Sequence, residues 1–287
     1  MINDWQKYQI PGNDRDIIWY ELGEGPEVLF LHGNWDLVMY MPMLEAQQRH
    51  FRTLLLKQRG ADCWKSPETF NRLPIAPFLD DIERLRRHKG VDKLIVVGHS
   101  WGAQLALHYA SAFPNHVTKL VAIGLGPISD EMSQYYHANV EKMVHPDKFP
   151  QLEAINQRFK AEFASGQGVS EAVDTAYADV YSTVWAYSPE AAQRIKTDYL
   201  NAGGFRRVAA GAPRSDPEVF LKGLKQIGCP TLIVYGYQDY EPITQAYVLK
   251  AHFQNAEIAF INRCGHMPWL DQPDTFYRLL DEFINRR

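Results

Sequence analysis

Short apolar runs alternate with longer amphipathic segments through residues 1–126 of the chain. Short runs rich in β-branched and aromatic residues are typical of strands, and apolar residues at three- and four-residue spacing are typical of helices. This pattern predicts strands at residues 8–10, 16–22, 27–31, 53–57, 94–97 and 117–123, and helices at about 37–49, 75–89 and 101–110. The first two strands flank a Pro-Gly-Asn-Asp turn and are predicted as a hairpin at the sheet edge. The alternation predicts an α/β protein with a doubly wound, mostly parallel sheet.

The alternation stops after residue 126, and residues 128–226 are helical in character with no convincing strand. Helices are predicted there at 134–144, 152–164, 170–184, 189–199 and 217–224. Strands then return at 231–236 and 256–261, with helices at about 243–253 and 273–287. A helical stretch of this length between two sheet strands predicts an inserted lid. We therefore expect a core domain of residues 1–126 and 227–287 and a helical lid of residues 127–226.

The predicted lid is rich in aromatic residues, and most of these are expected to form its own core. A lid also has an underside that faces the sheet, and the side chains there would shape a substrate pocket. Trp185 is the lid residue that we name as a candidate for this pocket.

A serine stands between a predicted strand and a predicted helix, in the sequence Gly98-His99-Ser100-Trp101-Gly102. This is a G-x-S-x-G pattern with a strand before it and a helix after it, which is the context of a nucleophile elbow. A sharp strand-to-helix turn leaves no room for a Cβ atom at either glycine and holds the serine in a strained conformation. The plainer alternative is an ordinary turn with an exposed serine. We predict that Ser100 is a nucleophile.

A serine nucleophile needs a base within hydrogen-bond reach, and the base needs an orienting carboxylate. Chemistry in an open parallel sheet gathers at the carboxyl ends of the strands. Asp239 follows the predicted strand 231–236, and His266 follows the strand 256–261, so both should reach the edge where Ser100 lies. We predict Asp239 and His266 as the acid and base of a triad, in the chain order associated with G-x-S-x-G elbows. Glu241 and Asp271 are the competing carboxylates.

An acyl-transfer serine also needs backbone N–H groups that stabilise the tetrahedral oxyanion. Trp101 offers one at a helix N-terminus, and the loop after residue 31 offers a second, predicted to come from Asn34. Gly33 would let this loop turn an N–H group toward the pocket. Trp35, next in the loop, and His99, beside the nucleophile, are further candidates for the substrate pocket.

Composition narrows the function classes. The 287 residues carry a formal charge of −4 from 30 basic and 34 acidic residues, with no long run of either sign, so nucleic-acid binding gains no support. We see no signal peptide and no apolar run of about 18 residues, so no membrane partner is expected. The three cysteines have no metal-like spacing and fit reduced thiols in a cytoplasmic protein. We expect no metal and no cofactor, with the oligomeric state left open.

The chain resembles the α/β-hydrolase superfamily over essentially its whole length. The motifs that carry the resemblance are HGNW (32–35), QRGADCWKS (58–66), GHSWG (98–102), GYQDYEP (236–242) and CGHMPW (264–269). The segments around the elbow and the Gln-Arg-Gly at 58–60 are similar to the proline iminopeptidase branch, peptidase family S33. HGNWD replaces the glycine-rich loop of that branch, and GHSWG replaces its GGSWG. Epoxide hydrolases and haloalkane dehalogenases, which have aspartate at the elbow, are disfavoured by Ser100.

These patterns together predict a cofactor-independent serine hydrolase that acts on a small-molecule ester, amide or related acyl substrate through an acyl-enzyme. An S33-type aminopeptidase is the nearest alternative, and other chemistries on the same triad, such as C–C bond hydrolysis or perhydrolysis, stay open. A small-molecule receptor built on a hydrolase scaffold is the alternative from another class. The intact triad and oxyanion loop argue against the receptor.

Overall fold

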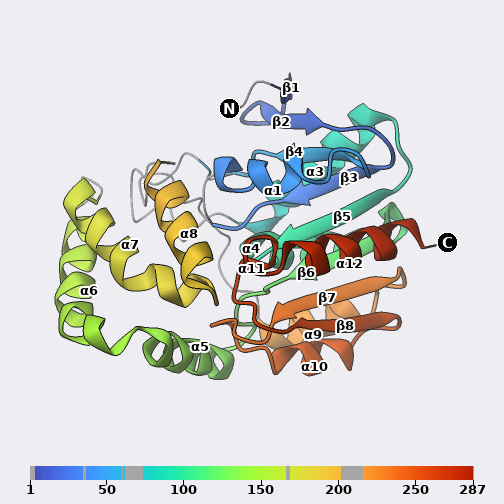
Figure 1. The fold of residues 1–287 in the computed structure, drawn as a ribbon. Helices are drawn as coiled ribbons and strands as arrows, with labels where there is room; N and C mark the ends of the chain where they lie inside the picture. Colours follow the sequence, from blue (N-terminus) through green and yellow to red (C-terminus); the bar gives the residue numbers. More distant parts are fainter. Residues whose placement is uncertain are drawn as a thin grey trace.

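The strands of the computed structural model form one eight-stranded sheet in the order β1-β2-β4-β3-β5-β6-β7-β8 (Figure 1). The structure describes residues 4–34, 37–59, 61, 74–165, 169–201 and 216–286. The strands are β1 Gln6–Ile10, β2 Ile17–Leu22, β3 Glu27–Leu31, β4 Arg52–Leu56, β5 Leu94–His99, β6 Val117–Ile123, β7 Thr231–Gly236 and β8 Ala256–Ile261. Every strand predicted from the sequence is present.

Strand directions agree with the predicted sheet. β1 and β2 form an antiparallel hairpin at one edge, and β2 pairs antiparallel with β4. The remaining neighbours, from β4 to β8, are all parallel. β3 pairs with β4 on one side and with β5 on the other, so the strand order reverses beside β3. Such a reversal opens a crevice at the carboxyl ends of the strands, where ligands bind in α/β proteins.

Helices cover both faces of the sheet (Figure 1). Alternate residues of β3 point to opposite faces, since Leu29 and Leu31 belong to one apolar cluster and Val28 and Phe30 to the other. The first cluster holds buried residues of α3 Ile75–Lys89, α4 Trp101–Ala112 and α10 Gln245–Lys250. The second holds residues of α1 Met41–Glu45, α11 Pro268–Asp271 and α12 Pro273–Asn285. The doubly wound architecture is therefore confirmed.

The first predicted helix is shorter than expected. The segment expected as a helix over about 37–49 forms a 3₁₀ turn η1, Leu37–Met39, and the short helix α1. After α1 the N–H groups of Gln47 and Gln48 bond to carbonyls three residues earlier, at 3.1 and 3.3 Å. These are tight-turn bonds, which end the helix before the chain enters β4.

The chain between β6 and β7 is helical in the described residues. Its elements are α5 Asp130–Met143, η3 Pro146–Lys148, α6 Phe149–Ala164, α7 Glu171–Trp185, α8 Pro189–Asn201 and α9 Pro217–Leu224. The helices α5 to α8, which we call the cap helices, lie together to one side of the sheet (Figure 1), with α7 in contact with α5, α6 and α8. None of the helices in the described ranges is long and apolar enough to cross a bilayer.

Helix α9 differs from the cap helices in its packing. It contacts α4, and its residues Phe220 and Leu224 belong to the first apolar cluster, which also holds Leu29 and Leu31 of β3. The division of the chain at residues 126 and 226 stays a prediction, and these contacts favour ending the lid before Asp216.

Candidate active site

Ser100 occupies the turn between β5 and α4 with φ 55° and ψ −122°. Arg263 is the other non-glycine residue with positive φ among the residues that the structure describes. Two backbone hydrogen bonds fix the turn: the N–H of Ser100 donates to the carbonyl of Ile123 at 2.8 Å, and the carbonyl of Ser100 accepts from Ala103 at 2.9 Å. The sharp, strained turn expected at the elbow is present.

The two glycines of the elbow are required by close backbone approach. A Cβ atom on Gly98 would lie 2.2 Å from the carbonyl oxygen of Gly102. A Cβ atom on Gly102 would lie 2.0 Å from the carbonyl oxygen of Leu31, at the end of the neighbouring strand. A side chain at Gly98 would therefore push β5 and α4 apart, and one at Gly102 would push α4 away from β3.

The side chains of Asp239 and His266 form a buried pair beyond the ends of β7 and β8. Nδ1 of His266 lies 3.0 Å from Oδ1 and 3.1 Å from Oδ2 of Asp239. The two residues are 2% and 3% exposed, for His266 and Asp239 respectively. A carboxylate can only accept, so Nδ1 carries a proton that it donates to Asp239, and Nε2 is the ring nitrogen left for proton transfer. This is the ring orientation that a general base needs.

Ser100 and His266 both lie against the end of β6. The carbonyl of Ile123 binds the N–H of Ser100, and the next residue, Gly124, has φ +53°. A Cβ atom on Gly124 would lie 3.0 Å from both Cε1 and Nδ1 of His266. The described residues show no hydrogen bond between the Ser100 hydroxyl and the His266 ring; in unliganded enzymes such bonds are often long and shorten when substrate binds.

The competing carboxylates face other groups. Asp271 accepts hydrogen bonds from the N–H groups of Gly265 at 2.8 Å, Tyr187 at 2.9 Å and Ser188 at 2.9 Å. Glu241 lies beside Gly126, where a Cβ atom would be 3.8 Å from its Oε1. Asp239 is thus the carboxylate seen against the ring of His266.

The candidate oxyanion loop packs directly on the nucleophile. A Cβ atom on Gly33 would lie 2.5 Å from the hydroxyl of Tyr40 and 3.0 Å from Cβ of Ser100, so lack of space requires glycine here. The N–H of Gly33 donates to the Tyr40 hydroxyl at 2.9 Å. The next residue, Asn34, is exposed, and Trp101 begins α4. These positions leave the N–H groups of Asn34 and Trp101 as the candidate donors.

The predicted pocket residues lie in different surroundings. Trp35 falls outside the described residues. His99 has no exposed surface and lies within a hydrogen-bonded group behind Ser100, so it does not fit the predicted role of a pocket wall. Trp185 is 7% exposed and packs against the ring of Tyr199, with centroids 5.5 Å apart.

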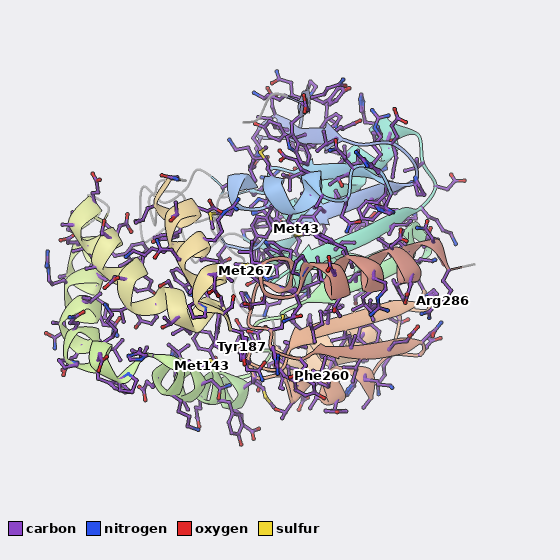
Figure 2. All side chains as sticks on the ribbon, viewed as in Figure 1. Met43, Met143, Tyr187, Phe260, Met267 and Arg286 are labelled. Carbon is purple, nitrogen blue, oxygen red and sulfur yellow. The ribbon has the colours of Figure 1, made fainter. Side chains whose placement is uncertain are left out.

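The cap helices reach the histidine loop through the backbone. The N–H of His266 donates to the carbonyl of Trp185 at 3.1 Å. A Cβ atom on Gly265 would lie 3.0 Å from Cα of Ala186 and 3.1 Å from the nitrogen of Tyr187. Met267 and Tyr187 both lie where the cap helices meet the sheet (Figure 2). The predicted base is therefore held directly against the cap.

One residue of this site had no signal in the sequence. Tyr40 lies in the turn between η1 and α1, is 1% exposed and bonds both Gly33 and His99. A tyrosine in a predicted helix is more often a packing residue, and nothing in the neighbouring sequence marks Tyr40 as part of a site.

No cluster of three or more metal-ligating side chains occurs in the part of the chain that the structure describes.

Comparisons with known proteins agree with this fold. Residues 26–273 match the family model described as alpha/beta hydrolase fold, and the chain belongs to this family. A proline iminopeptidase of Saccharolobus solfataricus is 23% identical over 296 residues, covering 99% of this chain and 90% of that protein. Epoxide hydrolase 3 of Mus musculus is 34% identical over 110 residues, covering 37% of this chain and 29% of that protein.

Among solved structures, a proline iminopeptidase of Mycobacterium smegmatis superposes with a TM-score of 0.69 at 14% identity, covering 98% of each chain. The meta-cleavage product hydrolase CumD superposes with a TM-score of 0.64 at 20% identity, also over 98% of each chain. The protein is an enzyme of the hydrolase class, with a weaker similarity to proline iminopeptidases.

Proposed function

We propose that the protein hydrolyses a small ester, amide or related acyl substrate through an acyl-enzyme formed on Ser100. One observation carries the proposal. His266 is oriented by Asp239 at 3.0 Å, at the strand edge where Ser100 is held in a strained elbow. Nucleophile, base and acid come from the ends of three different strands, which is the arrangement that a triad needs.

The chemistry follows from the atoms in place. As Oγ of Ser100 attacks the substrate carbonyl carbon, its proton passes to Nε2 of His266. The carboxylate of Asp239 stabilises the imidazolium that forms. The N–H groups of Asn34 and Trp101 would bind the oxyanion, each contributing about 3 kcal/mol to transition-state stabilisation. The imidazolium then gives its proton to the leaving group, and a water molecule activated by His266 releases the acid.

The test compares Ser100→Ala with the wild type on an activated aryl ester and with a fluorophosphonate probe. Ser165→Ala is the matched control, because its exposed hydroxyl bonds the carbonyl of Glu162 at the end of α6. We expect Ser100→Ala to lose at least about 10⁴-fold in kcat and all labelling, with the control unchanged. Turnover that survives in Ser100→Ala excludes the proposal. A wild-type protein that neither turns over the ester nor reacts with the probe supports the alternative of a small-molecule receptor.

A proline iminopeptidase activity is the second candidate, favoured by the similarity to such an enzyme over 99% of this chain. The comparison of a proline arylamide with a short-chain aryl ester separates the two. A strong preference for the arylamide that disappears when its amine is blocked indicates the peptidase. A preference for the ester indicates an esterase.

A further inference from the structure

A chain of three hydrogen bonds joins the candidate oxyanion loop to the histidine loop behind Ser100. The N–H of Gly33 lies 2.9 Å from the hydroxyl of Tyr40. That hydroxyl lies 3.0 Å from Nδ1 of His99. Nε2 of His99 lies 3.0 Å from the carbonyl oxygen of His266. The chain therefore ends on the two loops that flank the nucleophile.

The two ends fix the direction of every bond. A backbone N–H can only donate and a backbone carbonyl can only accept. His99 must therefore carry its proton on Nε2 and donate it to the carbonyl of His266. Its Nδ1 then accepts from the hydroxyl of Tyr40, and that hydroxyl accepts from Gly33. Each polar group has the partner that it needs, with a single consistent arrangement of protons.

Burial keeps this chain of bonds dry and neutral. His99 is 0% exposed and Tyr40 is 1% exposed. Burial lowers the pKa of His99 well below its usual 6.5, and the nearby His266 lowers it further. The ring of His99 is therefore neutral. Burial raises the pKa of Tyr40 far above its ordinary value, so its hydroxyl keeps its proton. The rings of His99 and His266 lie 4.5 Å apart, and a neutral His99 leaves the imidazolium of His266 free of a neighbouring cation.

Packing holds the two side chains in place. The ring of Tyr40 lies 5.6 Å from Phe30 on β3 and 5.8 Å from Trp269 on α11. Trp269 also stands edge-on to His99 at 4.8 Å. Tyr40 is thus packed against aromatic rings of two different elements, which limits the positions that its hydroxyl can take. Polar groups buried in this way rigidify the backbone that they bind.

We propose that Tyr40 and His99 are positioning residues for the hydrolysis proposed above: they hold the backbone of Gly33, and with it the oxyanion donor Asn34, at a fixed place relative to His266. The inference rests on the proposed function. The hydrogen bonds of both side chains go to other groups than Ser100 and the ring of His266. Their effect would be on the geometry of the transition state, where a displacement of about 1 Å can cost about 100-fold in rate.

The first experiment compares Tyr40→Phe with Tyr109→Phe. Tyr109 is equally buried, and its hydroxyl donates to Glu83 at 2.7 Å, so both variants lose one buried hydroxyl. We expect kcat of Tyr40→Phe on the aryl ester to fall about 10- to 100-fold, with KM changed less than about threefold. Tyr109→Phe should keep kcat within about twofold. Equal kcat losses in the two variants, per folded molecule, overturn the proposal.

A second pair of variants, at His99, tests the proposal if Tyr40→Phe does not fold. His99→Gln keeps a donor for the carbonyl of His266, whereas His99→Leu of similar size leaves that carbonyl unpartnered. We expect kcat of the Gln variant to exceed that of the Leu variant by about tenfold. Equal values overturn the proposal.

Imidazole NMR separates this proposal from the proposed function. In the wild type the His99 ring should carry its proton on Nε2 and stay neutral at a pH where an exposed imidazole is protonated, because burial lowers its pKa well below 6.5. Tyr40→Phe should shift the Nδ1 resonance, because Nδ1 loses its donor. A proton on Nδ1 overturns the positioning proposal even in an active enzyme. If Ser100→Ala retains turnover, the proposed function fails while these resonances still report the chain of bonds.

Discussion

The Nδ1 atom of His266 lies 3.0 Å from Oδ1 of Asp239 and 3.1 Å from Oδ2, inside a site where both residues are buried. Asp271 also comes close to the histidine loop, but its carboxylate binds the backbone of Gly265 and of the cap segment at Tyr187 and Ser188. The two carboxylates therefore have different structural roles. Asp239 orients a ring, and Asp271 holds the loop that bears the ring against the cap.

Replacing each carboxylate by its amide tests this division. Asp239→Asn should lower kcat by roughly 10³- to 10⁴-fold, because the amide favours the wrong tautomer of His266. Asp271→Asn should keep kcat within about tenfold, since it leaves the ring alone. It should lower the free energy of unfolding by about 1–3 kcal/mol, because an amide nitrogen would face a backbone N–H. Steady-state kinetics and urea unfolding measure both. An equal kcat loss in the two variants would mean that the acid is misassigned.

The close backbone approach at the elbow gives a second prediction. A Cβ atom on Gly102 would lie 2.0 Å from the carbonyl of Leu31, so Gly102→Ala should lower the free energy of unfolding by about 3 kcal/mol or more. Gly228→Ala is the control, because its nearest contact would be Gln254 Oε1 at 3.9 Å. The control should change stability by less than about 1 kcal/mol. Urea midpoints give the comparison, and similar midpoints would contradict the steric account.

The strands, and the places of Ser100, Asp239 and His266 at the strand ends, could be predicted from the sequence. Period-two and period-3.6 patterns report burial, so β7 at Thr231–Gly236 and α3 at Ile75–Lys89 fall where the pattern places them. The pairing of Asp239 with His266 followed from topology alone, since parallel strands bring their carboxyl ends to one edge.

What the sequence could not reveal depends on contacts between distant residues. Tyr40 bonds His99, which lies 59 positions further along the chain, and no local pattern marks a tyrosine whose hydroxyl has such a distant partner. His99 is a pocket candidate from its place beside Ser100, but its buried ring bonds the carbonyl of His266 instead, on a loop 167 positions away. The packing of α9 on α4 was likewise hidden, because an amphipathic helix does not show which surface it covers.

A third prediction concerns stability in acid. Burial alone would raise the pKa of Glu83, but hydrogen bonds from its neighbours outweigh burial and lower the pKa from 4.5 to about 2. The donors are Arg86, Tyr109 and His116. The unfolded chain takes up this proton first, so the contribution of the carboxylate, about 2–3 kcal/mol, is complete above pH 4.5 and lost as pH falls toward 2.

Glu83→Gln should therefore be less stable than the wild type at pH 7, with a difference that shrinks between pH 4.5 and 2. Urea unfolding across this range measures it. Glu282→Gln is the control: Glu282 pairs with Arg278 on the surface at 3.3 Å, and its loss should cost less than about 1 kcal/mol at any pH. A Glu83→Gln difference that is constant with pH would show that the carboxylate's charge is not what stabilises the fold.

The strain at Ser100 gives the last prediction. Its φ of 55° with ψ −122° is a conformation that glycine adopts freely and other residues adopt at a cost of about 1–3 kcal/mol. Glycine also loses about 0.5–1 kcal/mol more on folding. Ser100→Gly should therefore be more stable than Ser100→Ala by about 0.5–2 kcal/mol, while neither turns over substrate. Alanine keeps the Cβ atom and so the strain, which makes it the matched control. Urea unfolding of the two variants measures the difference directly. A glycine variant no more stable than the alanine variant would mean that the elbow stores no strain at this residue.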